Sequence, residues 1–170
     1  MRTLTLFIAT SLDGRIAGPQ GEIDWLFTDQ DYGYAAFYES LDTVLLGRRT
    51  WDVSLGFGED PFPGVRTIVF TRTARPKTRR AEFVTTDIAE FVTALKSEPG
   101  KGIWLVGGGE IVAACARADL IDEYRIFVHP RILGDGIPLF PSPLPDRRLR
   151  FVASRAFDTG LTELHYRRSP

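Results

Sequence analysis

The sequence predicts an α/β domain with a mixed, mostly parallel central sheet that is flanked by helices and extended by a C-terminal antiparallel hairpin. Short apolar runs alternate with amphipathic segments along most of the chain, as in βαβ units on a parallel sheet. Several of these runs are continuous, which is typical of strands covered on both faces. Two final β-rich runs flank Asp158-Thr159-Gly160, a hairpin signal.

The N-terminal part predicts a strand, a helix and a second strand. Thr3–Thr10 is β-branched and apolar and stops at Ser11-Leu12-Asp13-Gly14, a turn sequence. A helix is predicted from about Asp29 to Leu41, where apolar side chains recur at spacings of three and four. The continuous apolar run at Thr43–Leu46 predicts a buried strand.

The middle of the chain repeats this order. Pro61–Gly64 predicts a turn, Thr67–Thr71 the next buried strand, and Phe83-Val84 a short strand. A helix follows, with Thr86 or Asp87 as its N-cap. Its apolar face carries Ile88, Phe91, Val92 and Leu95.

The last part begins with a strand at Gly102–Val106 that leads directly into three glycines. A helix from about Glu110 to Ala118 and a strand from Ile121 to Val128 are predicted next. A long loop rich in glycine and proline precedes the two hairpin strands, Leu149–Phe157 and Leu161–Arg167.

The chain has 170 residues, 44% of them apolar and 25% charged, which predicts one globular domain over residues 1–170. A net charge of −1 gives no reason to expect nucleic acid or an anionic membrane as a partner. The single cysteine, Cys115, excludes an internal disulfide and fits a reducing compartment. Without a signal-peptide pattern or a membrane-spanning apolar run, the protein is expected in the cytoplasm.

The run Gly107-Gly108-Gly109, between a strand and a helix, is the most informative local feature. Glycines let the backbone approach a ligand closely, and the free N–H groups of the following helix attract an anion. A pyrophosphate suits such a site. A tight turn that only requires positive φ would explain the glycines as well, and the G-x-G-x-x-G dinucleotide fingerprint is absent.

Two other predicted strands end in arginine. Gly47-Arg48-Arg49-Thr50-Trp51 and Thr71-Arg72-Thr73 both follow buried strands, and ligands of open α/β sheets bind at those carboxyl ends. Arginine binds phosphate oxygens through two parallel hydrogen bonds. Two arginines beside a glycine turn therefore predict a shared anion-binding edge, whereas Trp51 is expected in the core.

Candidates for catalytic groups are less distinct. The loop Ser11–Gly18 is a turn that could lie over a bound ring as a flap. Asp24, Asp29 and Asp31 precede the first predicted helix and could orient a substrate amine or supply a proton, although acidic residues there usually serve the helix dipole. His129 and His165 lack companions at metal-ligand spacing, so no metal site is predicted.

In order, these motifs resemble the dihydrofolate reductases. The resemblance rests on Leu45–Trp51, Pro61–Gly64, Thr67–Arg72 and Val106–Gly109, and the predicted strands extend it to nearly the whole chain. Two further segments, Ser11-Leu12-Asp13-Gly14-Arg15-Ile16-Ala17 and Leu133–Phe140, are more similar to the reductase domain of the bifunctional riboflavin-biosynthesis deaminase–reductase. That protein's zinc-binding deaminase half has no counterpart in this sequence.

The resemblance implies a reductase that binds NADPH. The matching positions would be Ala9, Ile16, Gly47, Arg48, Thr50, Thr71, Arg72, Gly107, Gly108, Gly109 and Glu110. Ala9 and Ile16 would lie near the nicotinamide, and the amides of the glycine turn would bind the pyrophosphate. Arg48 or Arg72 would neutralise the adenosine 2′-phosphate. A homodimer is also expected, because riboflavin-type reductases pair through their sheets and C-terminal segments.

Two departures argue against dihydrofolate as the substrate. Folate reductases carry Trp-x-Leu-Pro-x-acid, whereas Trp25-Leu26-Phe27-Thr28-Asp29-Gln30 has Gln30 at the acidic position. They also carry an arginine directly after Pro-x-Pro-Gly, where this chain has Val65. A small heterocyclic, pyrimidine or pterin-like, or sugar-derived substrate is therefore expected, with a true dihydrofolate reductase and a non-catalytic nucleotide- or drug-binding protein as alternatives.

Overall fold

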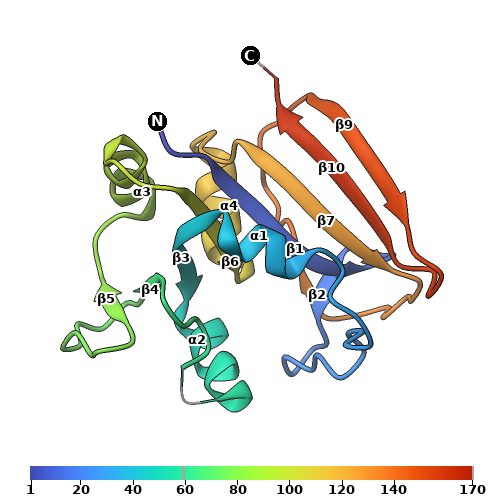
Figure 1. The fold of residues 1–170 in the computed structure, drawn as a ribbon, viewed down its shortest axis with the longest axis horizontal. Helices are drawn as coiled ribbons and strands as arrows, with labels where there is room; N and C mark the ends of the chain where they lie inside the picture. The colour runs from blue at the N-terminus through green and yellow to red at the C-terminus, as the bar shows by residue number, and fades with distance from the viewer. Residues whose placement is uncertain (59, 170) are drawn as a thin grey trace.

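A computed structural model describes residues 1–58 and 60–169 (Figure 1). An eight-stranded sheet has the order β5-β4-β3-β6-β1-β7-β10-β9, and β2 pairs with β8 in a small second sheet. The strands are β1 (Leu4–Ser11), β2 (Arg15–Ala17), β3 (Leu41–Gly47), β4 (Arg66–Phe70), β5 (Glu82–Val84), β6 (Gly102–Gly107), β7 (Glu123–His129), β8 (Ile137–Pro138), β9 (Leu149–Ala156) and β10 (Thr162–Arg168). The helices are α1 (Tyr34–Glu39), α2 (Arg48–Ser54), α3 (Ile88–Ser97) and α4 (Gly109–Arg117), with a 3₁₀ turn η1 (Leu55–Phe57).

The six strands from β5 to β7 in the large sheet are parallel to one another. β10 pairs antiparallel with β7, and β9 pairs antiparallel with β10. The predicted mixed sheet with a C-terminal hairpin is therefore confirmed, and the hairpin lies at the edge farthest from β5 (Figure 1). Among the described helices, none is both long and apolar enough to cross a membrane.

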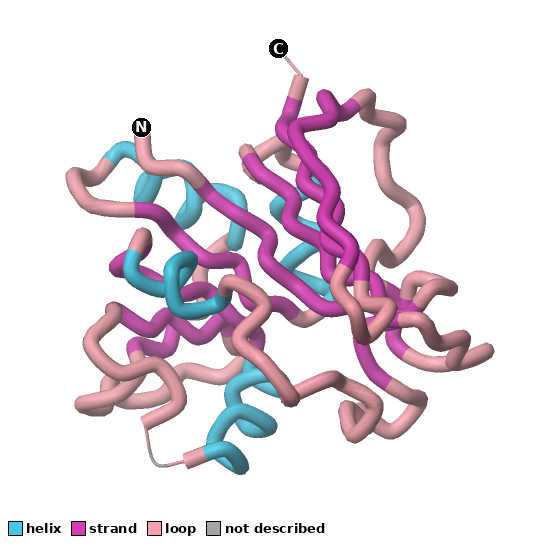
Figure 2. The backbone as a smooth tube through the Cα atoms, turned by 45° about the vertical axis from the view of Figure 1, so that its right-hand side comes forward, coloured by secondary structure: helices cyan, strands magenta, loops and turns pink. Residues whose placement is uncertain are grey.

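Two hydrophobic clusters cover opposite faces of the sheet. Along β3, Leu45 belongs to one cluster and Val44 and Leu46 to the other, because successive side chains of a strand point to opposite faces. The first cluster includes α3 and α4, and the second includes α1 and α2, so helices lie on both sides of the strands (Figure 2). Trp51 is buried in the second cluster as expected. Cys115 is buried in the first, where desolvation raises the pKa of its thiol to about 12.

The first helix is shorter than predicted. α1 begins only at Tyr34, because Tyr32 and Gly33 have φ of 53° and 84°, which are left-handed values that interrupt a helix. The carboxylate of Asp31 accepts hydrogen bonds from the N–H groups of Gly33 and Ala35. At the other end, Leu41 is the first residue of β3 rather than the last of the helix.

The sequence left the N-cap of α3 open between two residues. Asp87 is the N-cap, since its carboxylate accepts a hydrogen bond from the N–H of Glu90. The sequence indicates neither bounds for α2 nor the β2–β8 pair. β8 has only two residues and pairs across more than a hundred residues, so no local pattern indicates it.

Candidate active site

The predicted anion-binding residues meet at one edge of the sheet. Gly47, the last residue of β3, is in register with Phe70, the last residue of β4. Leu46 is in register with Gly107, the last residue of β6. Because these strands are parallel, the residues that follow them lie along their common carboxyl edge.

A crevice is expected where the connections leave the sheet in opposite directions. β3 and β6 are neighbours, but α2 packs on one face of the sheet and α4 on the other. Such a topological switch point is where open α/β sheets bind ligands. The turn after β3 and the turn after β6 lie close together, as two distances from a hypothetical Cβ atom on Gly47 show. A Cβ on Gly47 would lie 3.2 Å from Ile111 Cδ1 and 3.8 Å from the backbone nitrogen of Gly108.

Both helices at this crevice begin with a glycine. Gly47 is the N-cap of α2 and Gly108 that of α4, and neither helix has a side-chain hydrogen bond at its N-cap. The first N–H groups of each helix have no intrahelical acceptor, so they remain available to an anion. A Cβ on Gly108 would lie 3.4 Å from Thr50 Oγ1. The turns therefore form a cradle of backbone amides and one hydroxyl that a side chain would fill, and this arrangement fits a dinucleotide pyrophosphate.

The three glycines do not have the same role. Only Gly107 of the three has a positive φ, at 129°, so only there does a turn conformation exclude other residues. Gly108 is extended, with φ −73° and ψ −171°. At Gly108 a glycine therefore provides space rather than an unusual dihedral angle, so both of the reasons considered for the run apply, each at a different residue.

The two predicted phosphate arginines lie on this edge and already have carboxylate partners. Arg48 Nε donates to Asp52 at 2.8 Å, one turn along α2. Arg72 pairs with Glu110 at 3.2 Å, which joins the segment after β4 to the first turn of α4. Both pairs are exposed, and exposed pairs contribute little to stability, so a bound phosphate can compete with the carboxylates for these arginines.

The end of β1 lies beside the glycine turn. Ile8 Cδ1 is 3.4 Å from where a Cβ on Gly107 would be, and Ala9 follows Ile8 along β1. Ile16, in β2, packs against the cluster on the α4 side. The positions implied for the nicotinamide are thus next to the positions implied for the pyrophosphate.

The segment after β1 is a braced ribbon. The Asp13 carboxylate accepts hydrogen bonds from the Ser11 hydroxyl at 2.6 Å and from the N–H groups of Leu133 and Gly134. These bonds, chiefly the one from Ser11, lower the pKa of Asp13 to about 2. The β2–β8 pairing continues the brace; the role of this segment as a flap over a bound ring stays a prediction.

His129 holds another segment, around Phe27, at the same edge, a role that was not predicted from the sequence. It ends β7 opposite Ser11 of β1 and is 3% exposed. Its Nε2 accepts a hydrogen bond from the N–H of Phe27 at 3.1 Å, and its Nδ1 lies 3.2 Å from the Phe127 carbonyl. The rings of Trp25 and Phe27 pack against the imidazole. The sequence feature that could have indicated this role is a histidine at the end of an apolar strand.

This clamp should depend on pH. Burial is the main cause that lowers the pKa of His129 below its ordinary 6.5. The unfolded chain then binds the proton more readily, so this stabilisation is complete above pH 6.5 and is lost as the pH falls below that value towards the folded-state pKa. Denaturant midpoints measured across this range should decline below pH 6.5 in the wild type. The variant His129→Gln keeps a hydrogen-bond acceptor for Phe27, and its denaturant midpoint should decline less below pH 6.5. Equal declines in the wild type and the variant would show that His129 is not the group whose protonation destabilises the protein.

The candidate catalytic carboxylates are all exposed. Asp29 accepts a hydrogen bond from the Tyr32 hydroxyl, which lowers the pKa of Asp29. Tyr32 also contacts Thr159 in the β9–β10 turn, and the carboxylate of Asp31 accepts a hydrogen bond from the N–H of Ala35 at the start of α1. Asp24 has no hydrogen bond or ion pair with any described residue. None of the three has the buried setting that raises the pKa of a proton-donating carboxyl group.

One buried donor near this edge has no acceptor. Arg15 Nη1 donates to the Gly136 carbonyl at 3.2 Å, whereas its Nε has no hydrogen-bond partner among the described residues. Arg15 lies directly before Ile16 in β2.

The described residues also contain no cluster of three or more histidine, cysteine or acidic residues able to hold a metal.

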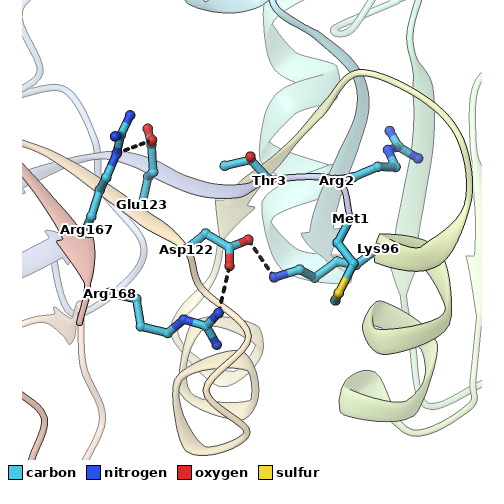
Figure 3. Close-up of a pocket in the computed structure, with 8 residues that line it drawn as sticks. All are labelled: Met1, Arg2, Thr3, Lys96, Asp122, Glu123, Arg167 and Arg168. Carbon is cyan, nitrogen blue, oxygen red and sulfur yellow. Dashed lines mark hydrogen bonds and ion pairs between the residues drawn. The ribbon is translucent and has the colours of Figure 1, made fainter. Parts of the chain in front are cut away.

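Two pockets lie at the opposite edge of the sheet. Figure 3 shows one of about 280 Å³ between the start of β1, the end of α3, the start of β7 and the end of β10. There Asp122 pairs with both Lys96 and Arg168. A second pocket of about 300 Å³ shares Thr3 and Glu123 with it. We place the site at the carboxyl edge, because the uncapped helices and glycine turns are there.

The match to known families agrees with this geometry. Residues 62–162 match the family model described as the RibD C-terminal domain. The chain belongs to the RibD C-terminal domain family. Two Bacillus subtilis proteins, YyaP and YwjB, both uncharacterized, are 35% and 38% identical to it. The alignments cover 97% and 99% of this chain and 94% and 99% of the relatives.

Solved structures place this RibD-type domain within the dihydrofolate-reductase-like fold. A Shewanella protein provisionally assigned to riboflavin biosynthesis has a TM-score of 0.87, with 28% identity and 99% of both chains covered. The deaminase/5-amino-6-(5-phosphoribosylamino)uracil reductase of Thermotoga maritima has a TM-score of 0.75 at 17% identity, over 99% of this chain and 57% of that one. A dihydrofolate reductase from Enterococcus faecalis, complexed with NADP(H), has 0.72 at 20%, over 99% and 97%. These last two likenesses show the fold alone.

Proposed function

We propose that this protein is an NADPH-dependent reductase that transfers a hydride to an imine or carbonyl of a small heterocyclic or sugar-derived substrate. The proposal is carried by one observation. The N-termini of α2 and α4 meet beside β3 and β6, and each has a glycine N-cap and no side-chain hydrogen bond to its first N–H groups. NADPH, when bound, supplies the hydride. The protein binds the cofactor, orients it and excludes water.

In this proposal, different residues along the carboxyl edge of the sheet bind different groups of the cofactor. The amides after Gly47 and Gly108 bind the pyrophosphate, with the Thr50 hydroxyl beside them. Arg48 and Arg72 bind the adenosine 2′-phosphate in exchange for their surface carboxylates, with Thr71 on the adenine side. The nicotinamide then lies toward the end of β1.

The substrate would lie between the nicotinamide and the segment held by His129. A ring that packs on Phe27, which is 36% exposed, would fit this position. The unpaired Nε of Arg15 offers such a ligand a buried donor, and a buried donor without an acceptor costs about 1–3 kcal/mol. A substrate like 5-amino-6-(5-phosphoribosylamino)uracil, a pyrimidine with a sugar phosphate, has both a ring that can pack on an aromatic side chain and oxygens that can accept from an arginine.

NADPH oxidation tests this proposal. The purified protein is incubated with NADPH and a panel of pterins, aminopyrimidines and phosphoribosylated pyrimidines, and absorbance is followed. Turnover of a pyrimidine supports the proposal, and rapid turnover of dihydrofolate favours a true dihydrofolate reductase. Tight NADPH binding with no turnover across the panel favours a binding protein that kept the cofactor groove.

Cofactor preference should follow the arginines. NADPH is expected to bind more tightly than NADH, because only NADPH presents a 2′-phosphate to Arg48 and Arg72. Arg48→Gln should weaken NADPH by about 1.5–3 kcal/mol and leave NADH nearly unchanged. Calorimetric titrations measure both affinities. Equal wild-type affinity for the two cofactors would refute the assignment of these arginines.

We also propose a homodimer. β9 is a strand of 8 residues at the edge of the large sheet, and most of its side chains are exposed, including Phe151 and Val152. A long exposed edge strand favours pairing with another chain. Ile132 and Phe140, in the segment between β7 and β9, are exposed as well, and we propose that they add apolar surface to the interface. Light scattering at micromolar concentration should report twice the chain mass, and a monomer there would reject this proposal.

A further inference from the structure

The loop between β4 and β5 is strongly basic. Residues 72–80 include five positive side chains and no acidic one, and all five are exposed: Arg72, Arg75, Lys77, Arg79 and Arg80. We call residues 72–80 the basic loop. The chain as a whole has a net charge of −1, so the rest of the molecule is acidic and the positive charge is local.

Much of this charge is not neutralised. Arg72 pairs with Glu110, and Lys77 approaches Glu82 at 3.5 Å. Arg75 and Arg79 have no hydrogen bond or ion pair with the residues that the structure describes. The backbone nevertheless has a defined shape, because Thr78 Oγ1 accepts hydrogen bonds from the N–H groups of two following residues.

The basic loop flanks the proposed cofactor crevice. It leaves β4 at Phe70, which is in register with Gly47, and its first arginine reaches the first turn of α4. In Figure 1 the loop and α2 lie at the same end of the molecule. A ligand that approaches the crevice from the β4–β5 side therefore passes this positive surface.

We propose that Arg75 and Arg79 of the basic loop speed the capture of NADPH by long-range attraction, without contacting the bound cofactor. This inference rests on the proposed function. NADPH carries a phosphate monoester in addition to its pyrophosphate, which adds about 1.5–2 negative charges relative to NADH. Clustered charge of one sign raises the association rate of an oppositely charged ligand, and the gain falls steeply as ionic strength rises.

Stopped-flow kinetics on the full chain test the proposal, with cofactor binding followed by tryptophan fluorescence. The double variant Arg75→Gln/Arg79→Gln removes two charges that have no partner among residues 1–58 and 60–169. Its association rate constant for NADPH should be about three- to tenfold lower at low salt, with the dissociation rate constant unchanged. The difference should disappear near 1 M salt, where screening acts over about 3 Å. NADH should be slowed less.

Arg148→Gln/Arg150→Gln is the matched control. It removes the same charge from two exposed arginines at the opposite edge of the sheet, and NADPH association should stay close to the wild-type rate. Equal slowing in both variants would assign the effect to net charge and overturn the proposal. Unchanged association, or a change in dissociation alone, would overturn it too. A wild type that fails to bind NADPH would instead refute the proposed function itself.

Discussion

Replacing Gly108 by valine is expected to abolish NADPH binding while the protein still folds. The φ and ψ of Gly108 are those of extended backbone, which valine adopts readily, and a poorer N-cap costs only about 1 kcal/mol. The new Cβ would lie 3.4 Å from Thr50 Oγ1, and its two methyl groups would occupy the cradle between α2 and α4. Calorimetry with NADPH and a thermal melt measure the two effects separately.

Two other glycines serve as comparisons. Gly107→Ala should destabilise the fold as well as impair binding, because φ of 129° is strained for any residue with a Cβ. Gly56→Ala should affect neither, since no atom lies within 4 Å of its hypothetical Cβ and its φ is ordinary. A folded Gly108→Val protein that binds NADPH normally would mean that the pyrophosphate binds elsewhere.

Turnover of dihydrofolate should be undetectable or far slower than in a true folate reductase. Gln30 stands where the pterin-binding acid is expected, and Val65 where the arginine for the glutamate tail is expected. Arg66 is engaged by Glu82 and Glu98. Each missing interaction costs about 1.5–3 kcal/mol, so both together weaken binding by several powers of ten if they add.

The double variant Gln30→Asp/Val65→Arg should raise dihydrofolate turnover, and NADPH binding should remain unchanged as the internal control. Steady-state kinetics with varied dihydrofolate and with varied NADPH separate a change in dihydrofolate turnover from a change in NADPH binding. Robust wild-type turnover at micromolar KM would contradict this account. Asp29, now held by Tyr32, or Asp31 would then be the acid that binds the pterin.

The strands, and the meeting of the glycine and arginine turns at one edge of the sheet, could be predicted because their signals are local. A buried strand is a continuous apolar run, and parallel strands bring the residues after Gly47, Phe70 and Gly107 to one edge. The start of α1 was misplaced because the apolar spacing continues through residues where Gly33 and Tyr32 turn left-handed. Hydrophobic periodicity does not report such a break.

The supports of the site could not be predicted, because they join distant parts of the chain. Phe27 and His129 are 102 residues apart, and Asp13 and Leu133 are 120 apart. Each looks ordinary in its own segment, a turn aspartate or an isolated histidine. The sequence also does not distinguish a glycine needed for its dihedral angles, Gly107, from one needed for space, Gly108.

Amide hydrogen exchange with and without NADPH tests the location of the cofactor most directly. We predict that NADPH protects the amides of residues 47–50 and 107–112, on the two turns that meet between β3 and β6, with further protection at the end of β1. The amides around Lys96 and Asp122, which line the pocket at the opposite edge, should exchange as before. Protection confined to that pocket, or no protection at residues 47–50 and 107–112, would contradict the proposed cofactor site.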